Sequence, residues 1–213
     1  MSEKRRGFVL ILSAPSGAGK STLAQHLIRS MPDILISVST TTRKPRPGEV
    51  EGQHYFFVEK TFFQNEIEQG NFLEWAEVFG NFYGTAKSFV EATLASGQDV
   101  VLDIDWQGAR VVRDHLSSAD VVGVSIVPPS LQSLRDRLER RGQDSAEVID
   151  ARMAQAGEEM SHWQEYEYLV INDDLEKSKA DLVAIVRAER LTRDRMAGQV
   201  KKITDEFGVN GVV

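Results

Sequence analysis

Residues 8–22 read FVLILSAPSGAGKST: an apolar run, a glycine-rich loop and then the start of a helical pattern. The loop follows the phosphate-binding pattern G-x-x-x-x-G-K-S/T over its last three positions, 19–21, but Ala14 stands where the pattern has its first glycine. Pro15 follows Ala14, and a residue before proline is held in extended conformations with negative φ, which alanine adopts without strain. We therefore expect a working phosphate loop with Ala14 at negative φ. The alternative is a glycine-rich turn that binds nothing.

The position of this loop explains how it can hold phosphate. A loop between a strand and a helix N-terminus points several backbone N–H groups at one spot, and the helix dipole adds positive potential there. Gly17 and Gly19 let the backbone approach the phosphates. We expect Lys20 to reach the β- and γ-phosphates of a nucleotide and the Ser21 hydroxyl to help hold Mg²⁺. The expected nucleotide-binding residues of the loop, which are ATP-binding residues if the nucleotide is ATP, are Ala14, Pro15, Ser16, Gly17, Ala18, Gly19, Lys20, Ser21 and Thr22. ATPases, GTPases and small-molecule kinases all use such a loop.

The composition is that of an ordinary globular protein and limits its partners. The chain has 213 residues, of which 41% are hydrophobic and 27% charged, enough for a domain with a large core. A signal peptide is an alternative for the basic start and apolar run, but that run leads straight into the glycine loop, as a buried strand does. No apolar run reaches the roughly 20 residues of a membrane span. The chain has no cysteine, and its net charge of −7 argues against indiscriminate nucleic-acid binding, so we expect a cytoplasmic location.

Apolar runs and helical patterns alternate along the chain, which predicts an α/β fold with a parallel sheet and helices on both faces. The predicted strands are 8–13, 34–38, 100–104, 121–127 and 168–171. The predicted helices are 21–29, 60–69, 90–96, 107–115, 131–141, one that starts at 145, and 175–195. Short aromatic runs between residues 53 and 85 predict a small lobe of short antiparallel strands around a helix. The tail from about residue 196 is weakly patterned, and we expect it to fray.

Two further segments carry groups that could recognise a second ligand. Residues 39–49, STTTRKPRPGE, hold Arg43 and Arg46 in a proline-stiffened loop, which suits a phosphate dianion unless the loop is merely solvated. Residues 72–85, FLEWAEVFGNFYGT, place Glu74 among aromatics, where a carboxylate needs a partner unless it faces water. Guanine presents N1–H and N2–H₂ together to such a carboxylate, whereas adenine has no such pair. The chain has no N-K-x-D sequence that would indicate a GTPase.

Six segments resemble guanylate kinase and occur in the order that this family has. They are SAPSGAGKST, SVSTTTRKPRPGEVEGQHYFF, FLEWAEVFGNFYGT, VVLDIDWQGA, PPSLQSLRDRLERRGQDS and VINDD. The resemblance spans about residues 7–190. It implies the fold of a P-loop nucleoside monophosphate kinase, with a small mixed α/β lobe that binds GMP and a helical lid. It also implies transfer of the γ-phosphoryl group of ATP to GMP, and to dGMP, giving ADP and GDP in purine nucleotide metabolism and GMP recycling, with Mg²⁺ bound as Mg-ATP.

The resemblance also divides the chain and assigns its site residues. The implied core covers about 7–38, 86–136 and 155–190, the GMP-binding lobe 39–85, the lid 137–154, and a C-terminal helical extension and tail 191–213. The implied ligands of the GMP phosphate are Arg43, Arg46, Tyr55 and Tyr83, and those of guanine are Ser39, Glu74, Thr85 and Asp103. The implied catalytic residues are Lys20, Arg137, Arg141 and Arg152. Asn172 matches a position near the adenine, and Ser21 and Asp105 are the metal candidates.

Spacing adds to these assignments. Arg137 and Arg141 are four residues apart and so share a helix face. Asp103 and Asp105 are expected to lie at the end of one strand and to have different roles, with Asp105 reaching the metal shell through water. The chain departs from many family members at Ala14, and at Phe82, where Tyr is common and where the ring is still expected to pack.

The reaction implied by the resemblance needs no general base. The acceptor is a phosphate oxygen whose second pKa is near 6, so it is mostly ionised at neutral pH. We therefore expect catalysis by positioning and charge neutralisation, and surface or packing roles for the histidines. The histidines are His26, His54, His115 and His162.

Other readings stay open at this point. One is a kinase for another monophosphate, such as AMP or dGMP alone. Another is a guanylate-kinase-like module that binds phosphopeptides without catalysis, although this chain keeps Lys20 and Ser21. The family resemblance also suggests a homodimer or a larger assembly.

Overall fold

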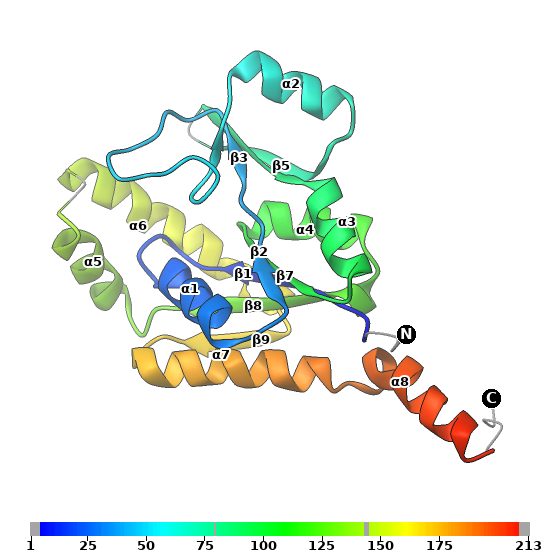
Figure 1. Ribbon diagram of the computed structural model, residues 1–213. Helices are drawn as coiled ribbons and strands as arrows, with labels where there is room; N and C mark the ends of the chain where they lie inside the picture. The colour runs from blue at the N-terminus through cyan, green and yellow to red at the C-terminus, as the bar shows by residue number, and fades with distance from the viewer. Residues whose placement is uncertain (1–4, 79, 143–144, 209–213) are drawn as a thin grey trace.

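The computed structural model describes residues 5–78, 80–142 and 145–208 (Figure 1). Residues 1–4, Phe79, residues 143–144 and residues 209–213 therefore lie outside the described part. The strands are β1 Val9–Ser13, β2 Ile34–Ile36, β3 Thr40–Thr41, β4 Phe56–Phe57, β5 Phe72–Val78, β6 Asn81–Ala86, β7 Asp99–Asp103, β8 Val121–Val127 and β9 Tyr168–Ile171. The α-helices are α1 Lys20–Ser30, α2 Lys60–Glu68, α3 Lys87–Ala95, α4 Trp106–His115, α5 Leu131–Arg140, α6 Ala146–Ser161, α7 Leu175–Arg190 and α8 Arg193–Glu206, with 3-10 turns η1 Ser118–Asp120 and η2 Trp163–Glu165.

The main sheet has the order β2-β7-β1-β8-β9, and all its strands run parallel. The central strand β1 is bonded on one edge by β7 and on the other by β8. The chain passes from β1 to the β2 edge and later returns to place β8 on the other side of β1. The carboxyl end of β1 is therefore the point where strand order reverses, where open α/β sheets bind ligands.

The two faces of β1 explain why its sequence is continuously apolar. Leu10 and Leu12 pack on one face with Leu23 of α1 and Leu182 of α7. The intervening residues, such as Ile11, pack on the other face with side chains of α3 and α4. Successive side chains of a strand point to opposite faces, so a strand covered on both sides must be apolar at each position. The predicted parallel sheet with helices on both faces is confirmed.

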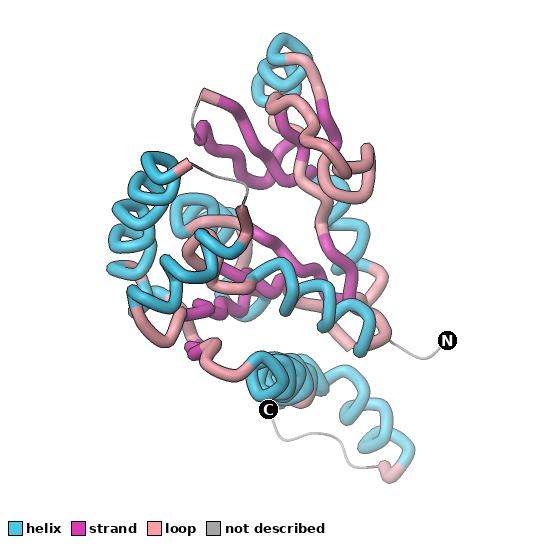
Figure 2. The backbone as a smooth tube through the Cα atoms, turned by 90° about the vertical axis from the view of Figure 1, so that its left-hand side faces the viewer, coloured by secondary structure: helices cyan, strands magenta, loops and turns pink. Residues whose placement is uncertain are grey.

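A second sheet, in the order β4-β3-β6-β5, forms the small lobe with α2 (Figure 2). Phe63 of α2 is fully buried, and its ring stacks on Phe72 with centroids 4.4 Å apart and on Phe82 at 5.4 Å. Phe82 packs as predicted. The prediction of antiparallel strands is wrong in one place, because β4 pairs in parallel with β3, and the strand β3 was not predicted.

Helices α5 and α6 form a small unit with a core of their own, built on Leu134 and Leu138 from one helix and Ile149 and Met153 from the other. Leu138 also lies against the phosphate loop, because a Cβ at Gly17 would come within 2.9 Å of its Cδ2. This unit covers the loop from one side (Figure 2).

The C-terminal region differs from the prediction. The helix expected over 175–195 ends at Arg190, and a new helix, α8, runs to Glu206 through the tail that was expected to fray. The turn between the helices brings Arg195 back onto the body, where its guanidinium lies 4.5 Å from the ring centre of Phe8. The contact of Arg195 with Phe8 joins residues far apart in the sequence, so the hydrophobic periodicity of the tail does not predict it. No helix in the described ranges is long and apolar enough to cross a membrane.

A fully buried carboxylate ties both ends of the domain together. Asp99 accepts two hydrogen bonds from Arg5, at 2.6 and 2.7 Å, and one from Arg190 at 2.8 Å. It also accepts a bond from the backbone N–H of Phe8 at 3.2 Å. Burying a charge is costly unless it is paired and hydrogen-bonded, and here the partners come from the N-terminal segment and from the end of α7.

We expect Asp99→Ala to lower the free energy of unfolding by roughly 3–5 kcal/mol, because it leaves two arginines largely buried without their anion. Urea unfolding measures the change. Asp194→Ala is the control, since the Arg193–Asp194 pair is exposed on α8 and such pairs contribute little. Equal stability of the two variants would contradict the role of Asp99.

Candidate active site

A cavity of about 810 Å³ opens at the carboxyl end of the main sheet, between the phosphate loop, the lobe and helices α5 and α6. Its wall includes the predicted residues Ala14, Pro15, Ser16, Gly17, Gly19, Lys20, Ser21, Thr22, Ser39, Arg46, Tyr55, Glu74, Tyr83, Asp103, Asp105, Arg137, Arg141, Arg152 and Asn172. Three predicted residues, all within the described ranges, are not part of the wall: Ala18, Arg43 and Thr85. The structure therefore brings most of the predicted ATP and GMP residues to one space.

The loop has the backbone that its sequence predicts. Gly17 and Gly19 have φ of 93° and 102°, which glycine adopts without the cost of a Cβ. Among the described residues the only non-glycine with positive φ is Asp33, so Ala14 has negative φ, as expected. The alanine at the first pattern position thus does not disturb the loop.

Asn172 contacts the backbone of the phosphate loop. It is buried, and its Nδ2 donates to the Ala18 carbonyl at 2.7 Å. A Cβ at Gly19 would come within 2.4 Å of the same nitrogen, so this approach requires glycine. Asn172 was predicted near an adenine, and its visible contact is with the loop backbone.

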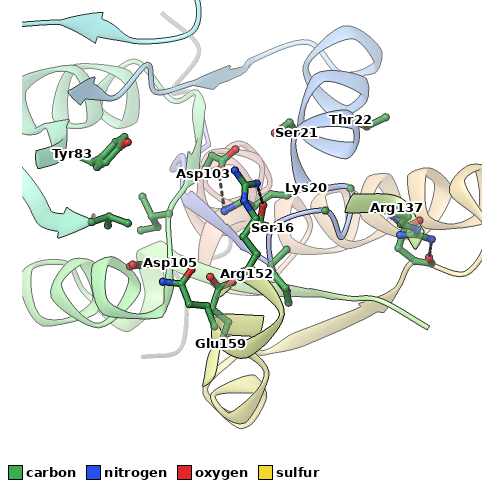
Figure 3. Close-up of a pocket in the computed structure, with 18 of the residues that line it drawn as sticks. Ser16, Lys20, Ser21, Thr22, Tyr83, Asp103, Asp105, Arg137, Arg152 and Glu159 are labelled. Atoms are coloured by element: carbon green, nitrogen blue, oxygen red, sulfur yellow. Dashed lines mark hydrogen bonds and ion pairs between the residues drawn. The ribbon is translucent and has the colours of Figure 1, made fainter. Parts of the chain in front are cut away.

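Lys20 and Asp103 form an ion pair in the centre of the cavity, with Nζ and Oδ1 2.6 Å apart (Figure 3). Burial lowers the pKa of Lys20, but the charge and hydrogen bond of Asp103 outweigh it, so the pKa is raised above its ordinary value. The lysine stays charged. The ion pair joins the predicted ATP-binding loop, through Lys20, to Asp103, a predicted ligand of guanine.

The three predicted arginines flank the loop: Arg137 lies on α5, Arg141 one residue beyond its end, and Arg152 on α6. Arg137 donates to the carbonyls of Asn172 at 2.7 Å and Ala18 at 3.3 Å, so it contacts the loop backbone. Arg152 of α6 donates to the Ser16 hydroxyl at 2.8 Å, while Arg137 lies apart from it (Figure 3). Arg141 caps the C-terminus of α5, one residue beyond the helix, and also lines the cavity.

On the lobe side, Arg43 is engaged with its own loop. Its guanidinium makes two bonds to Glu49, at 2.7 and 3.0 Å, and lies 5.2 Å from the ring centre of Tyr55. The hydrogen bond from Arg43 holds the pKa of Glu49 below its usual range. Arg46, three residues on, lines the cavity directly.

Glu74 is almost fully buried and reaches the cavity from β5. Its Oε1 accepts a 2.5 Å hydrogen bond from the Thr85 hydroxyl, which explains why Thr85 lies behind the wall. Burial raises the pKa of Glu74 to about 7, although the Thr85 hydrogen bond acts the other way. The alternative that Glu74 faces water is wrong.

Asp105 differs from its predicted setting. Strand β7 ends at Asp103, and Asp105 is the N-cap of α4, where its Oδ1 accepts from the Gly108 N–H at 2.9 Å. The prediction that both aspartates lie on one strand is therefore wrong, because the strand ends at Asp103. Asp105 still lines the cavity.

Several wall residues were missed by sequence reasoning. Gln155 and Glu159 follow Arg152 on the cavity side of α6, at spacings of three and seven residues that place them on one helix face. Burial raises the pKa of Glu159 to about 7, although the charge of Lys20 acts to lower it. Helical periodicity applied to Arg152 would have found both. The other missed residues are Ala76, Val78, Ile104, Asp173 and Leu175.

The histidines have the packing roles that were expected. His162 stacks on Trp106 with ring centres 3.8 Å apart, and His115 bonds to a carbonyl of its own helix. All four lie within the described residues, and none belongs to the cavity wall.

Basic side chains line the cavity on the loop side, with Lys20, and on the lobe side, with Arg46. Transfer between two phosphorylated ligands requires both ligands to be held in one such space. A parallel sheet with a phosphate loop after its central strand, a lobe and a helical unit together define a nucleoside monophosphate kinase of the P-loop class.

Comparison with known proteins identifies the family. The family model for guanylate kinase matches residues 6–189. The chain is 57% identical to the guanylate kinase of Shewanella frigidimarina, over 88% of this chain and 90% of that protein, and 53% identical to that of Maricaulis maris, over 90% and 88%. The crystal structure of guanylate kinase from Anaplasma phagocytophilum matches with a TM-score of 0.81 and 34% identity, over 98% of this chain and 99% of that one. The chain belongs to the guanylate kinase family.

The raised pKa of Glu74 predicts a pH-dependent stability. A carboxyl whose pKa folding raises from 4.5 to about 7 destabilises the fold in its charged form, so the penalty grows between those pH values and is complete above them. We expect Glu74→Gln to be more stable than the parent protein at pH 8, by up to about 3 kcal/mol, and equal to it below pH 4.5. Urea unfolding across this range tests this, with the exposed Glu77→Gln as the control. A stability difference that does not vary with pH would refute it.

Proposed function

We propose that this chain transfers the γ-phosphoryl group of ATP to GMP, and to dGMP, giving ADP and GDP in purine nucleotide metabolism and GMP recycling. The observation that carries the proposal is that a phosphate loop and a buried carboxylate able to read guanine face the same cavity.

The ATP side is assigned to the loop. The backbone of residues 14–19 and the α1 N-terminus receive the phosphates, and Lys20 neutralises their charge. Gly17 and Gly19 at positive φ support this assignment, because at these two positions no side chain separates the backbone from the phosphates. Asn172 holds the loop and borders the space for adenine. The full ATP set is Ala14, Pro15, Ser16, Gly17, Ala18, Gly19, Lys20, Ser21, Thr22 and Asn172.

The GMP side is assigned to the lobe. Glu74 accepts from the guanine N1–H and N2–H₂, and Thr85 orients it. Arg46 and, after release from Glu49, Arg43 hold the GMP phosphate, to which their fork of donors is matched. The remaining GMP residues are Ser39, Tyr55, Tyr83 and Asp103.

The residues present fit Mg²⁺ that arrives with ATP. Mg²⁺ keeps several waters and needs only one or two protein ligands besides the phosphates. Ser21 and Asp105 line the cavity as such ligands, and within the described residues no cluster of three or more His, Asp or Glu offers a protein cage. When bound, the ion neutralises charge on the phosphates.

The chain's own residues then position two polyanions in line. The GMP phosphate is already ionised, so no base is needed. Lys20 leaves Asp103 for the phosphates, and Arg137, Arg141 and Arg152 neutralise the transferring group. Water must be excluded, or ATP would be hydrolysed, so the lid and the lobe are expected to close when both ligands are bound.

The larger organisation follows the same proposal. The core comprises about 7–38, 86–136 and 155–190, the lobe 39–85, the lid 137–154 and a C-terminal extension 191–213. We place the protein in the cytoplasm, without nucleic-acid or membrane partners, and as a homodimer or larger assembly.

Lys20→Ala is expected to lower kcat by orders of magnitude, because the charge that neutralises the phosphates is lost while Asp103 stays in the cavity. A coupled assay for ADP with ATP plus GMP, dGMP or AMP measures this and shows which acceptor is used. Circular dichroism checks that the fold is intact. Turnover near that of the parent protein would refute the loop assignment.

Glu74→Gln is expected to weaken GMP binding at least tenfold and leave ATP binding unchanged, since an amide cannot accept both guanine donors. Calorimetric Kd values for the two nucleotides separate these effects. Glu77→Gln, on the same strand but exposed, is the matched control. Unchanged GMP affinity would remove the guanine-reading role.

A further inference from the structure

Glu74 approaches helix α4 more closely than a side chain at position 108 would permit. A Cβ atom added at Gly108 would lie 2.9 Å from Oε2 of Glu74 and 3.4 Å from its Cδ. Real Cβ atoms essentially never show contacts under 3.0 Å. The carboxylate therefore occupies the space that a side chain at position 108 would fill.

The other carboxylate oxygen is held from the opposite side. Oε1 accepts the 2.5 Å hydrogen bond from Thr85, which pairs directly with Glu74 across the β5–β6 ladder. Glu74 cannot turn away from α4 without losing this bond. The carboxylate is thus fixed between the lobe hairpin and the first turn of α4.

Glycine at position 108 is not required by the backbone. Gly108 lies within α4, outside the set of glycines with positive φ, and alanine is the better helix former at such a position. Its N–H donates to Asp105, a bond that alanine would keep. What glycine alone supplies at this position is room for Glu74.

We infer that Gly108 is a positioning residue for guanine recognition: its missing side chain lets the Glu74 carboxylate lie against α4 and face the cavity. This rests on the proposed role of Glu74 as the guanine reader. A methyl group at position 108 must push the carboxylate away by about half an ångström to reach an ordinary contact of 3.4 Å. Hydrogen bonds to N1–H and N2–H₂ made together lose strength with such a shift, because both depend on one geometry.

The test is Gly108→Ala, with binding of GMP and ATP measured separately by calorimetry. We expect Kd for GMP to rise about tenfold and Kd for ATP to stay the same, while kcat at saturating GMP changes little. Gly157→Ala is the matched control, because Gly157 lies in helix α6 and a Cβ there would meet nothing within 4 Å. It should leave both affinities unchanged.

A double-mutant cycle shows whether Gly108 acts through Glu74. In the Glu74→Ala background there is no carboxylate to displace, so Gly108→Ala should cause no further loss of GMP affinity. It should also raise Tm in that background and lower it in the parent protein. Additive losses would overturn the inference.

The outcomes separate this inference from the proposed function. If Gly108→Ala binds GMP like the parent protein while Glu74→Ala does not, the inference is wrong and the guanine-reading role stands. If Glu74→Ala itself binds GMP normally, the guanine-reading role fails, and the inference fails with it.

Discussion

The burial of strand β1 on both faces is the constraint on which the rest of the molecule depends. Each of its residues is buried, and both of its edges are bonded to neighbouring strands. This leaves its carboxyl end as the only part free to carry polar chemistry, and the phosphate loop starts there. Loop, α1 N-terminus and the aspartate at the end of β7 come together because parallel strands end at the same edge.

Within the cleft, the charged side chains that are proposed to meet substrates are paired with protein groups. Lys20 bonds to Asp103, Arg43 to Glu49, and Arg137 to loop carbonyls. Each pairing satisfies a charge that would be costly to leave alone in a partly buried site. On the proposed site roles, phosphate binding exchanges these partners, so the free energy of a nucleotide contact is reduced by that of the pair it replaces.

Sequence patterns predicted the core well, because buried strands and amphipathic helices carry their burial in their own periodicity. The strands at 121–127 and 168–171 match the structure residue for residue. The misses have long-range causes. β3 has only two residues and pairs with both β4 and β6, and α8, beyond the break after α7, contacts the body through Arg195 and Phe8.

The candidate site shows the same difference between local patterns and contacts between distant segments. Positions within a motif, such as the loop and Glu74, could be predicted from sequence. The ion pair of Lys20 with Asp103 could not, because it depends on how separate segments meet. The pairing of Arg43 with Glu49, the capping role of Asp105 and the place of Glu159 on the helix face of Arg152 are local features that were missed. Spacing gives a residue's direction along its own element, but the element opposite decides what it touches.

The cluster of Asp99, Arg5 and Arg190 has a consequence for attaching the protein to a tag, a surface or another domain. Arg5 and Arg190 meet on one carboxylate at the amino end of β7, so the chain enters and leaves the domain at one corner, at the opposite end of the strand from Asp103 and the cleft (Figure 1). A tag, a surface anchor or a fused domain attached through either end would leave the nucleotide entrance unobstructed.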